Sequence, residues 1–131
     1  NSKFFFFFLI KKEFKDHLGN VHTAIIFGEI KQISPIKFHT IGSDINLFLN
    51  NEKLNSMLKT INFLEAKGGI LIFLSDEMRN KESQKDYGIG AQILNCLNIK
   101  QIKLMTSGGK HSFVGLQGFG LEIVEEIQIE C

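Results

Sequence analysis

The feature that most constrains the fold is a helix that leads at once into a strand, over residues 51–74. Within residues 51–67, apolar side chains recur at intervals of three and four, the spacing of one helix face. That face is expected to pack in the core and consists of Leu54, Met57, Leu58, Ile61 and Leu64. Gly68 fits the left-handed position that often follows a helix. Residues 69–74 (GILIFL) are typical of a strand buried on both faces. The unit therefore predicts an α/β fold.

A second helix and strand are expected further along the chain. Ser83 and Asp86 have the spacing of a capping box, in which a serine and an acidic residue each bond the other's backbone amide. The apolar residues of this helix follow at three-residue steps, and they are Ala91, Leu94 and Leu97. Residues 102–105 alternate as a strand does, and residues 121–127 are typical of a closing strand. The loop 106–110 (TSGGK) then lies at the carboxyl end of a strand, where α/β sheets usually bind ligands.

The amino-terminal part of the chain predicts three further strands. Residues 4–10 (FFFFFLI) are continuously apolar, which indicates a strand buried on both faces, in the core or against a partner. Residues 21–27 and 35–39 are the other two. Pro35 is expected at a strand start, where a missing N–H does least harm. His22 stands apart from any Cys or carboxylate at metal-ligand spacing, so we expect a hydrogen-bonded structural histidine.

The composition excludes several classes of partner. The 131 residues suit a single domain, residues 1–131. A formal net charge of +1 gives no electrostatic footprint for nucleic acid or an acidic membrane, and no apolar run approaches the ~20 residues of a membrane span. Cys96 and Cys131 lie too far apart to form a disulfide framework, so a cytoplasmic location is expected. Because a strand-like run follows Asn1 almost at once, we hypothesise that the chain is a fragment of a longer polypeptide.

Several segments of the chain carry a family resemblance. Residues 86–94 (DYGIGAQIL) resemble the signature of the GTP cyclohydrolase II family. Residues 102–106 and 118–125 are similar to later segments of that family, and residues 19–28 and 35–40 to earlier ones. The resemblance implies a mixed twisted sheet flanked by helices. It also implies a place in riboflavin biosynthesis, where this family acts on GTP. In many bacteria it is fused behind a 3,4-dihydroxy-2-butanone 4-phosphate synthase.

The resemblance implies a catalytic zinc that this sequence does not support. The first of the family's three zinc cysteines corresponds to Gly42, and the loop that carries the other two is shortened here to residues 46–51, without a cysteine. A catalytic zinc needs three protein ligands and one open position. His39 with Asp44 is a conceivable substitute pair, but two groups do not complete a site. We therefore predict no zinc cofactor and no metal site.

The family's catalytic pair is replaced as well. The position of its proposed catalytic arginine holds Lys85, and that of its proposed base holds Ser83. A lysine is a point cation rather than a planar fork, and a serine is no general base without an activating partner. We predict no catalytic residue, and Ser83 is expected to act as the helix cap described above. The positions that the resemblance assigns to nucleotide or phosphate contact form a vestigial site: Lys37, His39, Glu77, Arg79, Thr106, Lys110 and His111.

Three functions fit these residues. In the first, the domain is non-catalytic and serves the assembly or regulation of an upstream synthase domain in the same polypeptide, with a homodimer held through apolar faces. In the second, it is an active GTP or phosphate-ester hydrolase with a rebuilt site. In the third, it senses a nucleotide or phosphate through loop 106–110, because Gly-rich loops can hold an anion on backbone amides. The first is the principal prediction, and whether the domain is an enzyme stays open.

Overall fold

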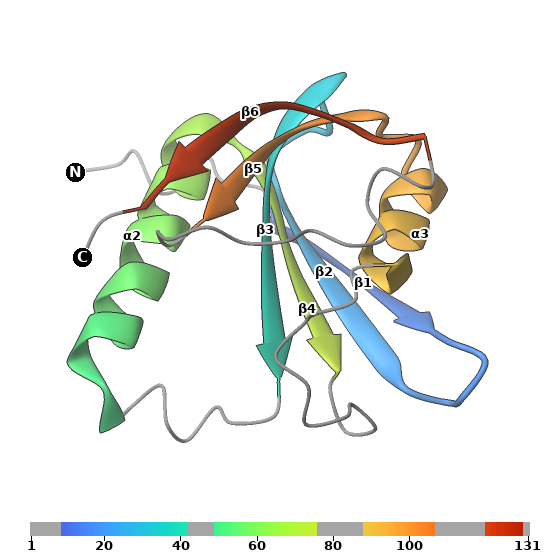
Figure 1. Cartoon of the computed structure of the whole chain (residues 1–131), viewed down its shortest axis with the longest axis horizontal. Coiled ribbons are helices and arrows are strands. Elements are labelled where there is room, and N and C mark those ends of the chain that lie inside the picture. The colour runs from blue at the N-terminus through green and yellow to red at the C-terminus, as the bar shows by residue number, and fades with distance from the viewer. Residues whose placement is uncertain (1–8, 42–48, 76–87, 107–119, 130–131) are drawn as a thin grey trace.

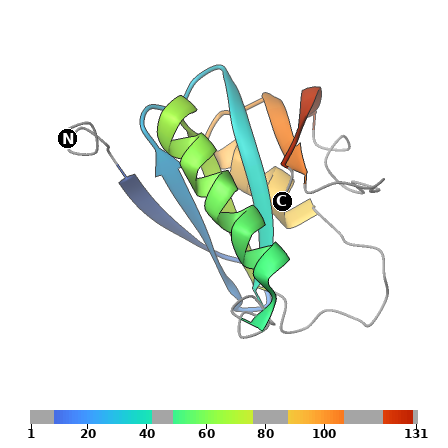
Figure 2. The same ribbon diagram turned by 90° about the vertical axis from the view of Figure 1, so that its left-hand side faces the viewer.

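The computed structural model describes residues 9–41, 49–75, 88–106 and 120–129. These ranges contain six strands and two helices: β1 (Leu9–Lys15), β2 (Val21–Phe27), β3 (Ile33–Ile41), α2 (Asn51–Lys67), β4 (Gly69–Ser75), α3 (Gly88–Cys96), β5 (Gln101–Thr106) and β6 (Glu122–Gln128). The strands form one twisted sheet, with α2 on one face and α3 on the other (Figures 1 and 2). The predicted α/β class, a mixed twisted sheet flanked by helices, is confirmed. Neither helix of the described ranges has the length and apolarity to cross a membrane.

The sheet has the strand order β1-β2-β4-β3-β5-β6. β1 pairs antiparallel with β2, and β2 antiparallel with β4. The pairs β3–β4, β3–β5 and β5–β6 are parallel. The chain passes from β3 to β4 through α2, and from β4 back across β3 to β5 through α3. Because crossovers between parallel strands are right-handed, two crossovers in opposite directions place their helices on opposite faces of the sheet.

Helix α2 has the predicted bounds, and its buried face departs from the predicted stripe at Leu58. Asn50 caps it, its side chain accepting a hydrogen bond from the Lys53 amide at 3.2 Å. The helix buries Ser56, Thr60 and Leu64, while Leu58, expected in the core, is 49% exposed. The Thr60 hydroxyl donates to the Ser56 carbonyl at 2.9 Å, and this satisfies the buried oxygen within the helix. The apolar stripe was therefore wrong at Leu58, because the helix turns its small polar residues toward the sheet.

The glycines after α2 have backbone conformations that other residues rarely adopt. Gly68 closes the helix at φ 83° and ψ 161°, so its φ is positive as predicted, although its ψ lies outside the left-handed helical region. Gly69 follows at φ 146°. A Cβ there would lie 2.5 Å from the Pro35 carbonyl oxygen and 2.6 Å from a Leu64 methyl group. Only glycine lets α2 turn into β4 this close to β3.

The core lies in two parts, one on each side of the sheet. On the α3 side, Ala91, Ile93 and Leu94 of the helix pack against buried residues of β2, β3, β4 and β5. On the α2 side, Leu64 packs with Phe27, Leu71, Met105 and Ile129. Strand β4 contributes to both parts, which confirms the expectation that it is buried on both faces.

Strand β1 differs from its prediction. Leu9 and Ile10, the described part of the Phe-rich run, do lie in a strand, but they are 57% and 47% exposed. The strand stands at the end of the sheet and pairs with β2 alone among the described strands. An edge strand covers little of the core, so burial in the core of this chain is wrong for these two residues, whereas burial against a partner stays a prediction. Residues 4–8 lie outside the described part.

Strand β3 is longer than predicted, and its proline lies inside it. Pro35 is the third residue of the strand and stands opposite Lys103 of β5. The pairing of β3 with β4 begins only at Ile36, one residue after Pro35. The proline therefore precedes the β3–β4 ladder, so a central strand accommodates it. The predicted strands 21–27, 69–74 and 102–105 are confirmed as β2, β4 and β5, and 121–127 as β6, which starts one residue later.

Candidate functional site

The carboxyl ends of the parallel strands share one edge of the sheet. Strands β3, β4 and β5 end there at Ile41, Ser75 and Thr106. β2 runs the opposite way, so the turn between β1 and β2 lies at the same edge. The neighbouring strands β3 and β4 lead to helices on opposite faces of the sheet. In open α/β sheets, ligands bind beyond the carboxyl ends of such a strand pair, and this rule places the candidate site there.

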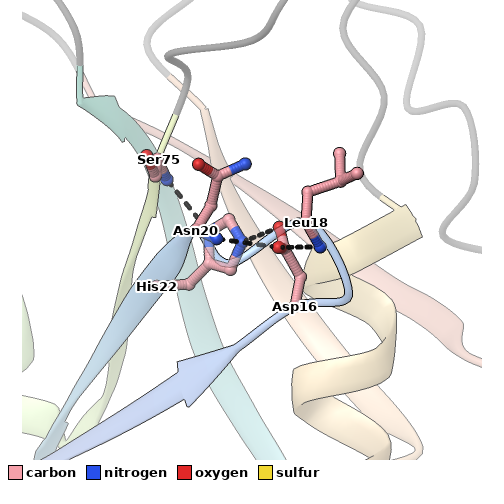
Figure 3. Close-up of polar contacts among 5 residues, drawn as sticks. All are labelled: Asp16, Leu18, Asn20, His22 and Ser75. Atoms are coloured by element: carbon pink, nitrogen blue, oxygen red, sulfur yellow. Dashed lines mark hydrogen bonds and ion pairs between the residues drawn. The ribbon is translucent and has the colours of Figure 1, made fainter.

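A buried hydrogen-bond network joins the β1–β2 turn to the end of β4 (Figure 3). The Asp16 Oδ2 lies 2.8 Å from the His22 Nε2, and the Ser75 backbone N–H donates to the His22 Nδ1 at 3.0 Å. The other carboxylate oxygen of Asp16 accepts from the backbone amides of Leu18 and Asn20, each at 2.9 Å. His22 is 3% exposed and the Asp16 side chain 8%. Every polar atom of the two side chains therefore has a partner.

These contacts determine the tautomer of His22. A backbone N–H can only donate, so the Nδ1 that receives the Ser75 amide carries no proton. The proton of the neutral ring is then on Nε2, from which it is donated to the Asp16 carboxylate. Both ring nitrogens are thus used within the protein. The ring is not free to take a proton from a substrate, which confirms the prediction of a hydrogen-bonded structural histidine.

The same contacts stabilise the ionised form of Asp16. Its pKa falls from 3.8 to about 2, chiefly because the His22 side chain donates a hydrogen bond to the carboxylate. Burial of the group acts in the opposite direction, and the amides of Asn20 and Leu18 lower the pKa further. Asp16 is therefore a carboxylate at neutral pH and is not available as a general acid.

Lys37 and His39 alternate along β3 with core residues. They stand opposite Leu71 and Phe73 of β4, so their side chains lie on the face that α2 covers. The His39 ring meets the Phe73 ring edge-on, with 5.5 Å between centroids. His39 is thus held near the carboxyl end of β3 by an aromatic contact.

Thr106 is the last residue of β5 and is 8% exposed. Its carbonyl oxygen accepts a hydrogen bond from the Ile129 amide at 2.7 Å, which ties the end of β6 to β5. Alternation along β5 places its side chain on the face of Leu104, the α3 side, opposite to that of Lys37 and His39. Among the described residues, His39 and Thr106 therefore lie near the carboxyl ends of their strands on opposite faces of the sheet, while Lys37 lies in the middle of β3.

The remaining predicted site residues lie outside the described part of the chain. They are Glu77, Arg79, Lys110 and His111 of the vestigial nucleotide site, and Ser83 and Lys85 at the positions of the catalytic pair. The capping box of Ser83 with Asp86 and the zinc-related positions 42 and 46–48 also lie there. Their grouping around a nucleotide stays a prediction.

The described residues do not fit a zinc ion. In residues 9–41, 49–75, 88–106 and 120–129, no three His, Cys, Asp or Glu side chains are close enough to hold a metal. Both nitrogens of His22 are already hydrogen-bonded, and the thiol of Cys96 is exposed on α3. A structural or catalytic zinc requires at least three such donors together.

Asp16 was missed by the sequence analysis, although a signal was present. An Asp whose carboxylate can bond the amides two and four residues later is typical of a tight turn, and the glycine of this turn, Gly19, has φ 88°. Gly90 was seen only as part of a signature. In the structure it lies against the Phe38 ring, where a Cβ would be inside van der Waals distance of the ring atom Cε1. Both residues gain their role from a contact distant in the sequence.

Comparison with known proteins supports the resemblance in part. Residues 76–128 match the family model of GTP cyclohydrolase II. The chain is 38% identical over 117 residues to the 3,4-dihydroxy-2-butanone 4-phosphate synthase of Sulfurospirillum multivorans, covering 89% of the chain and 33% of the relative. It is 40% identical over 110 residues to that of Campylobacter jejuni, covering 84% and 32%.

A further relative carries a different name. The chain is 43% identical over 77 residues to the riboflavin biosynthesis protein RibBA of Chlorobium phaeovibrioides, covering 59% of the chain and 18% of the relative. The chain thus spans about a third of the synthases that it matches, and less of RibBA.

Proposed function

We propose that this chain is a GTP cyclohydrolase II-like domain of riboflavin biosynthesis that has lost its zinc site and catalytic pair. In this proposal it is non-catalytic and serves the assembly or regulation of a 3,4-dihydroxy-2-butanone 4-phosphate synthase fused to it in one cytoplasmic polypeptide. The observation that carries the proposal is a joint substitution. Glycine replaces the first family zinc cysteine at Gly42, and lysine and serine occupy the catalytic positions Lys85 and Ser83.

The names and extents of the relatives support the fused partner. Relatives that align with 84% and 89% of the chain are named for the synthase, while a RibBA protein aligns with 59% of it. Each of these relatives extends far beyond the region that the chain matches. A synthase domain in the same polypeptide would occupy such additional length.

Zinc analysis tests the loss of the metal site. The protein, purified with a chelator, is incubated with zinc and freed of excess metal by gel filtration before its metal content is measured. We expect less than stoichiometric zinc, because no thiolate set is present at the family positions. A variant with Cys96→Ser and Cys131→Ser is the control for adventitious thiolate binding. Stoichiometric zinc that survives in this variant contradicts the proposal.

Incubation with GTP and divalent metal tests the loss of chemistry. We expect neither formate nor pyrophosphate above the level of buffer. The double variant Ser83→Asp, Lys85→Arg restores the family residues at both catalytic positions and is also expected to be inactive, because the zinc ligands are still missing. Turnover by the unmodified protein would establish instead the alternative of an active hydrolase with a rebuilt site.

The assembly role predicts a contact at β1, an outermost strand of the sheet. In the complete polypeptide, changing Leu9 and Ile10 of β1 to Lys is expected to weaken a homodimer or the contact with the synthase domain, because both side chains are exposed apolar groups on an edge strand. Sedimentation and synthase activity measure the outcome. Leu58→Lys, at an exposed site of α2, is the matched control. Unchanged assembly and activity in the β1 variant count against this surface.

One observation favours ligand sensing as a second candidate. Thr106 and His39 lie at the carboxyl edge of the sheet, where α/β folds bind ligands. If the domain still holds GTP or phosphate, ligand at 100 times Kd should stabilise it by about 2.7 kcal/mol. A thermal-shift panel of GTP and phosphate measures this, with Thr106→Val as the variant that keeps the shape and loses the hydroxyl. If neither ligand shifts the melting temperature, ligand sensing is excluded and only the assembly role is left.

A further inference from the structure

We propose that Asp16 and His22 are positioning residues that hold the carboxyl end of β4 in one orientation through a single histidine tautomer. The inference concerns Ser75, the last residue of β4, which directly precedes the region matching the cyclohydrolase family. It goes beyond the proposed function, because it assumes neither a bound nucleotide nor a fused partner.

The end of β4 has an unusual hydrogen-bond partner. Pairing of β4 with β2 runs from Gly69 to Phe73, and pairing with β3 continues to Ser75. Beyond Phe73, the contact with the β2 side is made by a ring, since the Ser75 amide donates to the His22 Nδ1. A side chain thus takes the place of a strand carbonyl at the point where the chain leaves the sheet. The direction of the Ser75 amide is fixed by the plane of the imidazole.

Asp16 in turn fixes that plane. Its carboxylate accepts a hydrogen bond from the His22 Nε2–H with one oxygen and hydrogen bonds from two turn amides with the other. The turn amides hold the carboxylate, the carboxylate holds the ring in its Nε2–H form, and the ring accepts from Ser75. Rotating the ring or moving its proton to Nδ1 would set two donors against each other inside the protein. Figure 3 shows the three residues in line, from the turn to the end of β4.

The hydrogen bonds from Asp16 through His22 to Ser75 lie at the end of the sheet where the candidate site is located. They lie beside the strand pair β3–β4, whose following segments lead to opposite faces of the sheet. A ligand-binding edge needs strand ends that are held in place. A hydrophobic residue at position 22 would pack without directing Ser75, whereas this ring controls one amide.

Asp16→Asn tests the proposal most sharply. The amide oxygen can keep both turn contacts, but the NH₂ group then faces the His22 Nε2–H, so the ring must change tautomer or give up a bond. We expect the ¹⁵N spectrum of the ring to change from the Nε2–H to the Nδ1–H pattern. We also expect hydrogen exchange at the Ser75 amide to accelerate roughly tenfold, while Ile26 and Ile70 keep their protection. Glu13→Gln, the same chemical change at an exposed site of β1, is expected to alter neither signal.

Two histidine variants separate positioning from packing. His22→Asn can keep the acceptor for Ser75 and loses the contact with Asp16, while His22→Gln can keep the donor to Asp16 and loses the acceptor. The Ser75 amide should therefore exchange more slowly in the first variant, which keeps the acceptor, than in the second. The same rate in both variants overturns the proposal, since packing alone would then account for His22. An Nδ1–H ring in the unmodified protein overturns it without any variant.

Discussion

Gly90 offers a sharp test of the packing on the α3 side of the sheet. The substitution Gly90→Ala brings two opposing effects. It lies within α3, where alanine is better than glycine by about 1 kcal/mol, and its φ is one that any L-residue adopts. The added Cβ, however, would be inside van der Waals distance of the Phe38 Cε1 and 3.1 Å from Cδ1 and Cζ of the ring. Helix propensity favours the variant, and packing opposes it.

The structure indicates that packing is the larger effect. Phe38 is 8% exposed and lies in the core between β3 and α3, so its ring cannot simply swing into solvent. Overpacking a core of this kind costs typically 1–3 kcal/mol. Taking about 2 kcal/mol for the clash and subtracting about 1 kcal/mol for the helix leaves a net loss near 1 kcal/mol. With a urea m-value of about 1.5 kcal/mol/M, the midpoint should fall by about 0.7 M.

A double-mutant cycle separates the two effects. Phe38→Leu removes the ring edge that faces Gly90, so in that background Gly90→Ala should become stabilising by up to about 1 kcal/mol. The chain has no Trp, so tryptophan fluorescence cannot report unfolding. Urea unfolding of all four proteins is therefore followed by far-UV circular dichroism. Gln92→Gly, at an exposed site of the same helix, calibrates the propensity alone. A stabilised Gly90→Ala in the wild-type background would refute the argument, since the ring would then not limit the approach of α3 to β3.

Three further predictions concern other contacts. Gly69→Ala should lower the free energy of unfolding by about 3 kcal/mol or more, because the φ is unfavourable for alanine and the added Cβ clashes with the Pro35 carbonyl. An unchanged urea midpoint would contradict this close approach. Leu64→Ala should lower the free energy of unfolding by about 2–5 kcal/mol, and Leu58→Ala by less than about 0.5 kcal/mol. Equal losses would show that Leu58 is in the core, as the sequence pattern predicted. Asp16 has a lowered pKa, so its contribution to stability is present above pH 3.8 and is lost as the pH falls toward about 2. Urea midpoints of the wild type and Asp16→Asn should therefore converge below pH 4, and a constant difference down to pH 2 would contradict the assignment.

The local pattern predicted the elements that have a full hydrophobic period of their own. Helix α2 and strands β4 and β5 lie where a 3.6-residue, an unbroken apolar and an alternating pattern, respectively, placed them. The patterns failed where the same spacing is compatible with two different orientations of an element in the fold. Leu58 belongs to the stripe by spacing, yet α2 buries Ser56 and Thr60, and the Thr60 hydroxyl is satisfied there by the Ser56 carbonyl. The apolar run before Lys11 likewise indicated a strand buried on both faces, yet its described residues, Leu9 and Ile10, lie exposed in the edge strand β1.

For the candidate site, the sequence by itself determined which residue types are present, and the loss of zinc and catalysis inferred from them stays a prediction. The residues at the family positions, among them Gly42, Ser83 and Lys85, can be compared with a motif without any coordinates. Their chemistry follows from residue type, since a glycine has no thiolate to offer a metal and a serine without a partner is no base.

Only the tertiary structure decided which residues meet. The strand order β1-β2-β4-β3-β5-β6 brings Asp16, His22 and Ser75 together, although 53 residues separate the last two. The same order sets Gly90 against Phe38 and gives β3 and β4 crossovers to opposite faces. Local patterns record the period of each element, whereas these contacts depend on which strands pair and in which register, and that choice is made by the packing of the whole sheet.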